Sequence, residues 1–203
     1  MNLETNSAPR IEQPAPNFIL PAVNGEMIAL ENFRGKQAVI VWFSRGFACP
    51  FCRQHMARLQ LGYPQFRARG VEILQIAPNP IARAQVYFSG RQLAFPYLCD
   101  STFRVYKEYG LADKGFPQAL GYDVVSNLRG IVSEPLAQAR AAVSDLAGRD
   151  FLERVVYHST VAIEQGVFIV DRAGIIKSAR VIGPIGNIPG NEELARELER
   201  LGD

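Results

Sequence analysis

Long hydrophobic runs are missing from this sequence, and so is an excess of either charge. No stretch approaches the roughly 20 apolar residues of a membrane-spanning helix, so we expect no membrane span. The 22 basic and 20 acidic residues leave a net charge of only +2, which argues against a nucleic acid as a partner. Residues 1–13 are polar and lack the basic and apolar regions of a secretory signal, so we expect a cytoplasmic protein.

Cysteine is scarce as well, and three cysteines among 203 residues are too few for a disulfide-stabilised scaffold. Two of them, Cys49 and Cys52, stand in the sequence Cys-Pro-Phe-Cys, between an apolar run at 38–43 and a helix-like stretch at 53–69. A pair with this spacing, at the junction of a buried strand and a helix, is typical of a dithiol redox site. The sequence therefore predicts an oxidoreductase.

The N-terminus of the predicted helix gives the two thiols different tasks. Cys49 is expected at or just before the first turn, where unpaired N–H groups and the helix dipole favour the thiolate. Cys52 is expected one turn inside and less exposed, close enough to attack Cys49 once that sulfur is oxidised. Arg45 is the best placed cation by sequence to stabilise the thiolate or a developing oxyanion, and Arg53 is the alternative. No Gly-rich nucleotide motif is present, so no cofactor is predicted.

The order of the predicted elements indicates one α/β domain over residues 1–203 with a thioredoxin-like fold. We expect a central mixed sheet flanked by helices, an N-terminal β-hairpin around Asn24-Gly25, and a helical insertion at about 112–165. The expected strands are 18–20, 27–30, 37–44, 71–77, 97–98, 166–171 and 175–182, and the expected helices are 53–69, 81–91, 103–109, 135–149 and 192–201.

Several segments resemble the peroxiredoxin-like proteins of the AhpC/TSA (alkyl hydroperoxide reductase/thiol-specific antioxidant) family. Residues 45–53, R-G-F-A-C-P-F-C-R, are similar to that group's R-G-x-x-C-P-x-C-R signature. The A-P-N-F at 15–18, the Phe95-Pro96 pair with Asp100, and the segment G-V-F-I-V-D at 166–171 resemble further family motifs. The resemblance covers roughly residues 15–110 and 165–201, and the insertion matches no motif.

The resemblance implies a thiol-dependent peroxidase that reduces hydrogen peroxide or organic hydroperoxides. Cys49 would be its nucleophile and Cys52 its resolving thiol. The reductant would be a thioredoxin-like protein or a small thiol, and a homodimer is one option for the assembly.

Three positions depart from the family pattern. Gly46 stands where peroxiredoxins usually carry a Thr or Ser, Gln165 where they carry an Arg, and Ala48 where an aromatic residue is common. These differences leave open a thioredoxin-like thiol-disulfide oxidoreductase with weak or no peroxidase activity. They also leave open a non-enzymatic redox switch that acts on the insertion.

Other roles for the cysteines are weighed against the redox site. Cys49 and Cys52 could be a buried pair without chemistry, or could join His55 and Cys99 in a zinc site. Cys99 could be a small buried hydrophobe or a second resolving thiol. His55 shares a helix face with Cys52 and could tune its thiol, while a packing role is the alternative.

Overall fold

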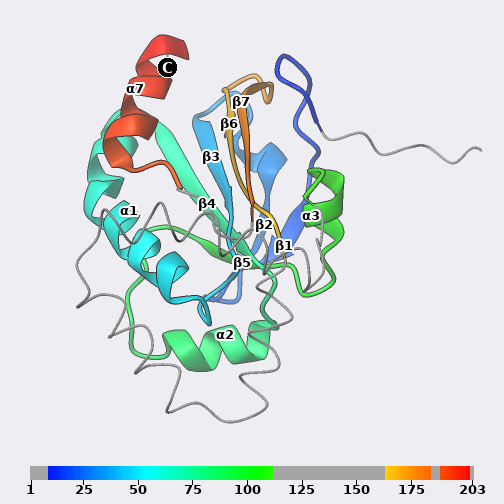
Figure 1. The fold of residues 1–203 in the computed structure, drawn as a ribbon, viewed down its shortest axis with the longest axis vertical. Coiled ribbons are helices and arrows are strands. Elements are labelled where there is room, and N and C mark those ends of the chain that lie inside the picture. Colours follow the sequence, from blue (N-terminus) through cyan, green and yellow to red (C-terminus); the bar gives the residue numbers. More distant parts are fainter. Residues whose placement is uncertain (1–8, 112–162, 184–187, 202–203) are drawn as a thin grey trace, which may run out of the picture.

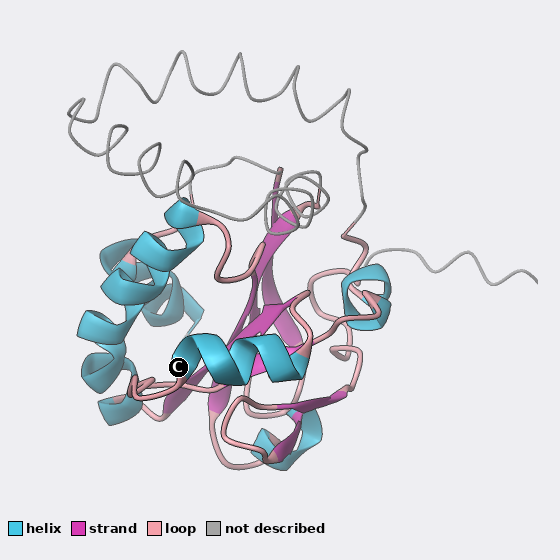
Figure 2. Ribbon diagram, turned by 90° about the horizontal axis from the view of Figure 1, so that it is seen from below, coloured by secondary structure: helices cyan, strands magenta, loops and turns pink. Residues whose placement is uncertain are grey.

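A computed structural model describes residues 9–111, 163–183 and 188–201, and within them a five-stranded sheet with helices on both sides (Figures 1 and 2). Nearly all of the predicted insertion at 112–165, including the helix expected at 135–149, lies outside the described residues. The extent of a single domain over 1–203 therefore stays a prediction. Among the described helices, none is both long and apolar enough to cross a membrane.

The strands form the mixed sheet that the sequence predicts. Their order is β5-β4-β3-β6-β7, with β3, β4 and β5 parallel to one another and with β6 and β7 antiparallel to their neighbours. The central strand β3 is buried at every position because its apolar run is covered on both faces. The bounds are β3 Ala38–Phe43, β4 Val71–Ala77, β5 Tyr97–Cys99, β6 Gln165–Val170 and β7 Ile176–Ile182.

The hairpin and the helices α1, α2, α3 and α7 lie where the sequence predicts them, whereas the short 3-10 helix η1 was not predicted. The remaining elements are β1 Ile19–Pro21, β2 Met27–Ala29, the 3-10 helix η1 Leu30–Phe33, α1 Pro50–Ala68, α2 Ile81–Phe88, α3 Arg104–Glu108 and α7 Asn191–Leu201. Helix α2 ends at Phe88, three residues earlier than expected, because Ser89 leaves the helical conformation and Gly90 takes a φ of +72°.

Alternate residues of β3 point into two separate apolar layers. Ile40 and Trp42 face the layer that α1 and α7 cover, and this layer also contains Cys49 and Cys52. Val41 and other residues of the strand face the second layer, which α3 and the N-terminal segment cover. Figure 1 shows α1 and α7 on one side of the sheet and α3 on the other. The cysteine pair thus belongs to the layer between the sheet and α1.

Asp100 fixes the short helix α3 against the sheet. Its buried carboxylate accepts hydrogen bonds from the backbone N–H groups of Arg104, Val105 and Tyr106, at 3.2, 2.8 and 3.3 Å. The Tyr106 hydroxyl in turn donates to the carbonyls of Ser44 and Ile76. A helix of this length depends on such a cap, because most of its N–H groups have no partner within the helix.

Replacement of Asp100 by Ala should therefore lower the free energy of unfolding by about 2 kcal/mol. Urea denaturation followed by the fluorescence of the single tryptophan, Trp42, measures the change. The control is Glu108→Ala, which removes a partly exposed ion pair to Arg104 and should cost only about 0.3 kcal/mol. Equal small losses in both variants would contradict this role of Asp100.

Candidate active site

The site lies in the loop that joins β3 to α1, above the carboxyl end of the central strand. Cys49 is the N-cap of α1, with extended backbone angles of φ −81° and ψ 116°, and Pro50 follows in the first turn. The Cys49 Sγ accepts a hydrogen bond of 3.3 Å from the backbone N–H of Cys52. The sulfur therefore takes the place of the oxygen that usually caps a helix, where N–H groups and the helix dipole favour negative charge.

Arg45 is the cation that the structure brings to this sulfur. Its guanidinium donates a 3.1 Å hydrogen bond to Cys49 Sγ, and the side chain is only 1% exposed. Arg53, the alternative by sequence, instead donates to the carbonyl oxygen of Phe47 at 3.3 Å. A buried charge beside a buried sulfur acts more strongly than it would in water, because little solvent screens it.

These contacts oppose the cost of burying a charged sulfur. Burial by itself raises the pKa of Cys49, but three kinds of contact outweigh it. They are the hydrogen bond from the Cys52 thiol, the charge of Arg45, and the backbone N–H groups of Cys52 and Phe51. Together they lower the pKa of Cys49 from 9.0 to about 6, so this sulfur is a thiolate at neutral pH.

Cys52 is held in the opposite state. Burial, its hydrogen bond to Cys49 and the negative charge on Cys49 raise the pKa of Cys52 well above 9.0. The expectation that Cys52 is the less exposed thiol is wrong, because both cysteines are 1% exposed. Protonation, rather than exposure, distinguishes the two sulfurs.

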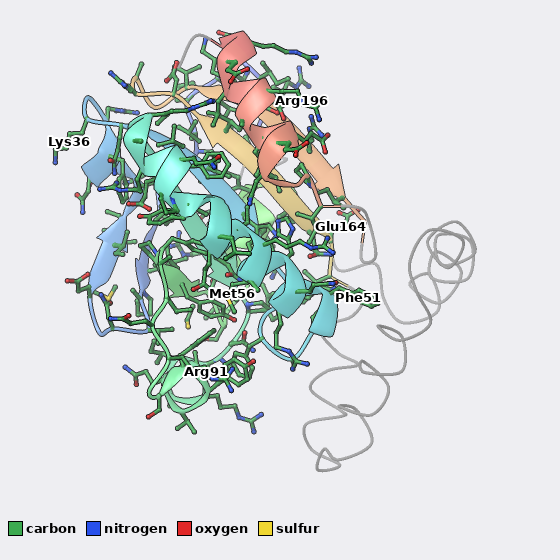
Figure 3. The ribbon with its side chains drawn as sticks, turned by 90° about the vertical axis from the view of Figure 1, so that its left-hand side faces the viewer. Lys36, Phe51, Met56, Arg91, Glu164 and Arg196 are labelled. Carbon is green, nitrogen blue, oxygen red and sulfur yellow. The ribbon has the colours of Figure 1, made fainter. Side chains whose placement is uncertain are left out.

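Gln165 contacts the second sulfur from β6, the strand that neighbours β3 in the sheet. Phe43 at the end of β3 pairs with Gly166, so Gln165, the first residue of β6, extends past the end of β3. There its Oε1 accepts a 3.3 Å hydrogen bond from the Cys52 thiol. Figure 3 shows Phe51, in the first turn of α1, and Glu164, just before β6, at the same end of the molecule.

A buried polar network, absent from the sequence prediction, supports the loop. The Phe47 N–H donates to Asn79 Oδ1 at 3.3 Å and to the Tyr97 hydroxyl oxygen at 3.2 Å, and that hydroxyl donates to Asn79 Oδ1. Asn79 follows β4 and Tyr97 begins β5, so neighbouring parallel strands bring both to the loop. In the sequence, Asn79 stands between Pro78 and Pro80 directly after a strand, and this was the available signal that its side chain could support the loop.

Gly46 is required by this network. Its φ is +84°, and a Cβ at this position would overlap Asn79 Oδ1. The structure thus gives a steric reason why no Thr or Ser stands at position 46.

The other roles and residues considered from the sequence, namely the zinc site, Cys99 and His55, take no direct part in the thiol pair. No three His, Cys, Asp or Glu side chains in the described part of the chain lie close enough together to hold a metal ion, so the zinc site is not formed there. Burial raises the pKa of Cys99 to about 12, so this thiol is protonated at neutral pH. Burial and then the charge of Arg58 lower the pKa of His55 to about 4, and its ring packs edge-on against Trp42 at 4.7 Å.

The link between Arg45 and the thiolate predicts a shift in reactivity. Arg45→Met should raise the pKa of Cys49 by roughly one to three units, since it removes the neighbouring positive charge. The pH dependence of Cys49 alkylation, with the modified peptide identified by mass spectrometry, measures the shift. Arg53→Met is the matched control and should leave the midpoint in place. Identical midpoints in both variants would rule out Arg45 as the stabilising cation.

The steric role of Gly46 predicts a large loss of stability on substitution. Gly46→Ala should cost about 3 kcal/mol, because a left-handed backbone strain and a collision with Asn79 add together. Gly90→Ala is the control, since Gly90 also has a positive φ but nothing within 4 Å of a Cβ, and it should cost about 1 kcal/mol. Equal losses in urea denaturation would show that Asn79 does not restrict the position.

Comparison with known proteins identifies the family of this chain. The sequence profile of the AhpC/TSA family matches residues 11–179. The thiol-disulfide oxidoreductase ResA of Halalkalibacterium halodurans is 30% identical over 106 residues, which are 52% of this chain and 59% of that protein. Peroxiredoxin Q, chloroplastic, of Oryza sativa subsp. japonica is 29% identical over 97 residues, 48% of this chain and 44% of that protein. This chain thus spans only about half the length of these relatives.

A solved structure agrees at the level of the fold. The reduced 2-Cys peroxiredoxin of Plasmodium vivax superposes with a TM-score of 0.59 over 95% of this chain and 96% of that chain, at 17% sequence identity. With the sequence profile matched over most of its length, the chain belongs to the AhpC/TSA family.

Proposed function

We propose that the protein is a thiol-dependent oxidoreductase that reduces peroxides through Cys49 and Cys52. The observation that carries the proposal is the Cys49 sulfur, held as a thiolate at the cap of α1 by Arg45 and the Cys52 N–H. An ionised sulfur is the nucleophile that this chemistry needs. A cytoplasmic location and a homodimer stay predictions.

In the first step the Cys49 thiolate attacks one oxygen of the peroxide. The S–O bond forms as the O–O bond breaks, so the sulfur is oxidised to a sulfenic acid. The leaving oxygen is reduced to water or an alcohol and takes up one proton. Arg45, already 3.1 Å from the sulfur, is placed to stabilise the negative charge on that oxygen.

In the second step Cys52 closes a disulfide with Cys49. The S–S bond forms as the S–O bond of the sulfenic acid breaks, and the Cys52 proton leaves with the hydroxyl group as water. A thioredoxin-like dithiol protein, or two molecules of a small thiol, then returns two electrons and two protons. This reductant completes the cycle without a metal or an organic cofactor.

The burial of the site favours a small substrate. Because both cysteine residues are only 1% exposed, a peroxide needs far less opening of the site than a protein disulfide does. This physical argument is the reason for placing peroxide reduction first.

A thiol-disulfide oxidoreductase is the second candidate. The similarity to ResA favours it, and so does Gln165, a neutral residue that contacts Cys52 where the family resemblance leads us to expect an Arg. In this reaction the Cys49 thiolate would attack a substrate disulfide and release one substrate thiolate. Cys52 would then displace the second one.

Replacing Cys49 and replacing Cys52 should have different effects on peroxide turnover. Cys49→Ser should abolish turnover with hydrogen peroxide and excess dithiol, because serine is not ionised at neutral pH. Without a dithiol, Cys52→Ser should still consume one equivalent of peroxide and then hold a sulfenic acid on Cys49, or a mixed disulfide if a monothiol is added, which mass spectrometry detects.

Cys99→Ser is the matched control and should keep wild-type rates. Peroxide consumption and disulfide reduction are measured side by side, so that the faster reaction identifies the substrate class. Full activity in Cys49→Ser with either substrate would refute the proposed function.

A further inference from the structure

Gln165 makes a contact with Cys52 that the proposed reaction does not itself require. It is 2% exposed, and its side-chain oxygen lies 3.3 Å from the sulfur. An amide oxygen can only accept, so the Cys52 thiol must be the donor in this contact. The same thiol lies within hydrogen-bonding reach of Cys49 Sγ, so a single proton faces two acceptors.

The two acceptors have different effects on the site. Donation to Cys49 stabilises the Cys49 thiolate, whereas donation to Gln165 stabilises the neutral form of Cys52 itself. Burial and the charge on Cys49 oppose ionisation of Cys52, whereas the charge and the backbone of Arg45 favour it. Tyr97 and Tyr106 are buried phenols whose pKa values burial raises, so they add no charge at neutral pH.

We propose that Gln165 is a positioning residue, whose side-chain oxygen holds the Cys52 thiol in place and protonated so that Cys49 alone attacks the substrate. This inference rests on the dithiol chemistry proposed above and adds what determines which of the two thiols reacts first. Without such an acceptor, Cys52 would ionise more readily beside Arg45. The acceptor also stabilises the dithiol form relative to the disulfide.

The test ranks three side chains of similar size at position 165. In the Cys49→Ala background we measure the alkylation rate of Cys52 by iodoacetamide at a fixed alkaline pH. Met provides no strong acceptor, Gln an amide oxygen and Glu a carboxylate, so the rate should fall in the order Met, Gln, Glu. A step of about tenfold corresponds to one pKa unit.

Burial alone predicts a different order. Met is less polar than Gln, so a role limited to packing would make Gln165→Met as slow as the wild-type residue or slower. That result would overturn the proposal. If the Met variant does not fold, Gln165→Glu decides the question alone, because it keeps both the size and the accepting oxygen. An unchanged or faster rate in this variant would also overturn the proposal.

Two controls separate this effect from a general change in structure. Cys99 is modified in the same samples, and its rate should not change between variants. Gln75→Met alters another buried glutamine, which donates to Ser44 Oγ at 3.0 Å, and should leave the Cys52 rate unchanged. A matching change in either control would mean that general opening, and not Gln165, sets the rate.

A second readout is the dithiol–disulfide equilibrium with glutathione in the chain that keeps both cysteines. Gln165→Met should shift it toward the disulfide, because the dithiol loses a stabilising hydrogen bond. A shift toward the dithiol would contradict the proposal. Neither readout needs substrate turnover, so the proposed function and the role of Gln165 can fail separately.

Discussion

A negatively charged sulfur inside a water-poor site is the constraint that organises this molecule. Burial disfavours the Cys49 thiolate, so the thiolate exists only because nearby groups offset that cost. Arg45 contributes a full charge, while the cap of α1 contributes a backbone N–H and the helix dipole. The same burial keeps Cys52 neutral, since no comparable contact outweighs it there. One environment therefore produces two thiols with opposite protonation.

The fold supplies this environment through the ends of its strands. The loop that carries Arg45 and Cys49 follows β3, the residues that support it follow β4 and begin β5, and Gln165 begins β6. Tyr106 reaches the loop from α3 on the opposite face of the sheet. Each neighbouring element thus fixes part of the loop, which holds the guanidinium at hydrogen-bonding distance from the sulfur.

Local spacing explains how much of this could be predicted from the sequence. The strands, the hairpin and the helix that follows Cys49 depend on short-range patterns, and the structure confirms them where it describes the chain. Arg45 could be named because it stands only four positions before Cys49. The contact between Cys52 and Gln165 joins residues 113 apart and depends on how β6 aligns with β3, which no local pattern specifies. Equal burial of both cysteines likewise depends on tertiary packing.

The central claim is that one buried sulfur is ionised at neutral pH. The most direct measurement is the ultraviolet thiolate absorbance of the fully reduced protein as pH is raised, with Cys49→Ser as the reference. The account predicts that the difference between the two proteins develops near pH 6 and reaches one thiolate. A difference that develops only near pH 9, the ordinary value for a cysteine, would contradict it.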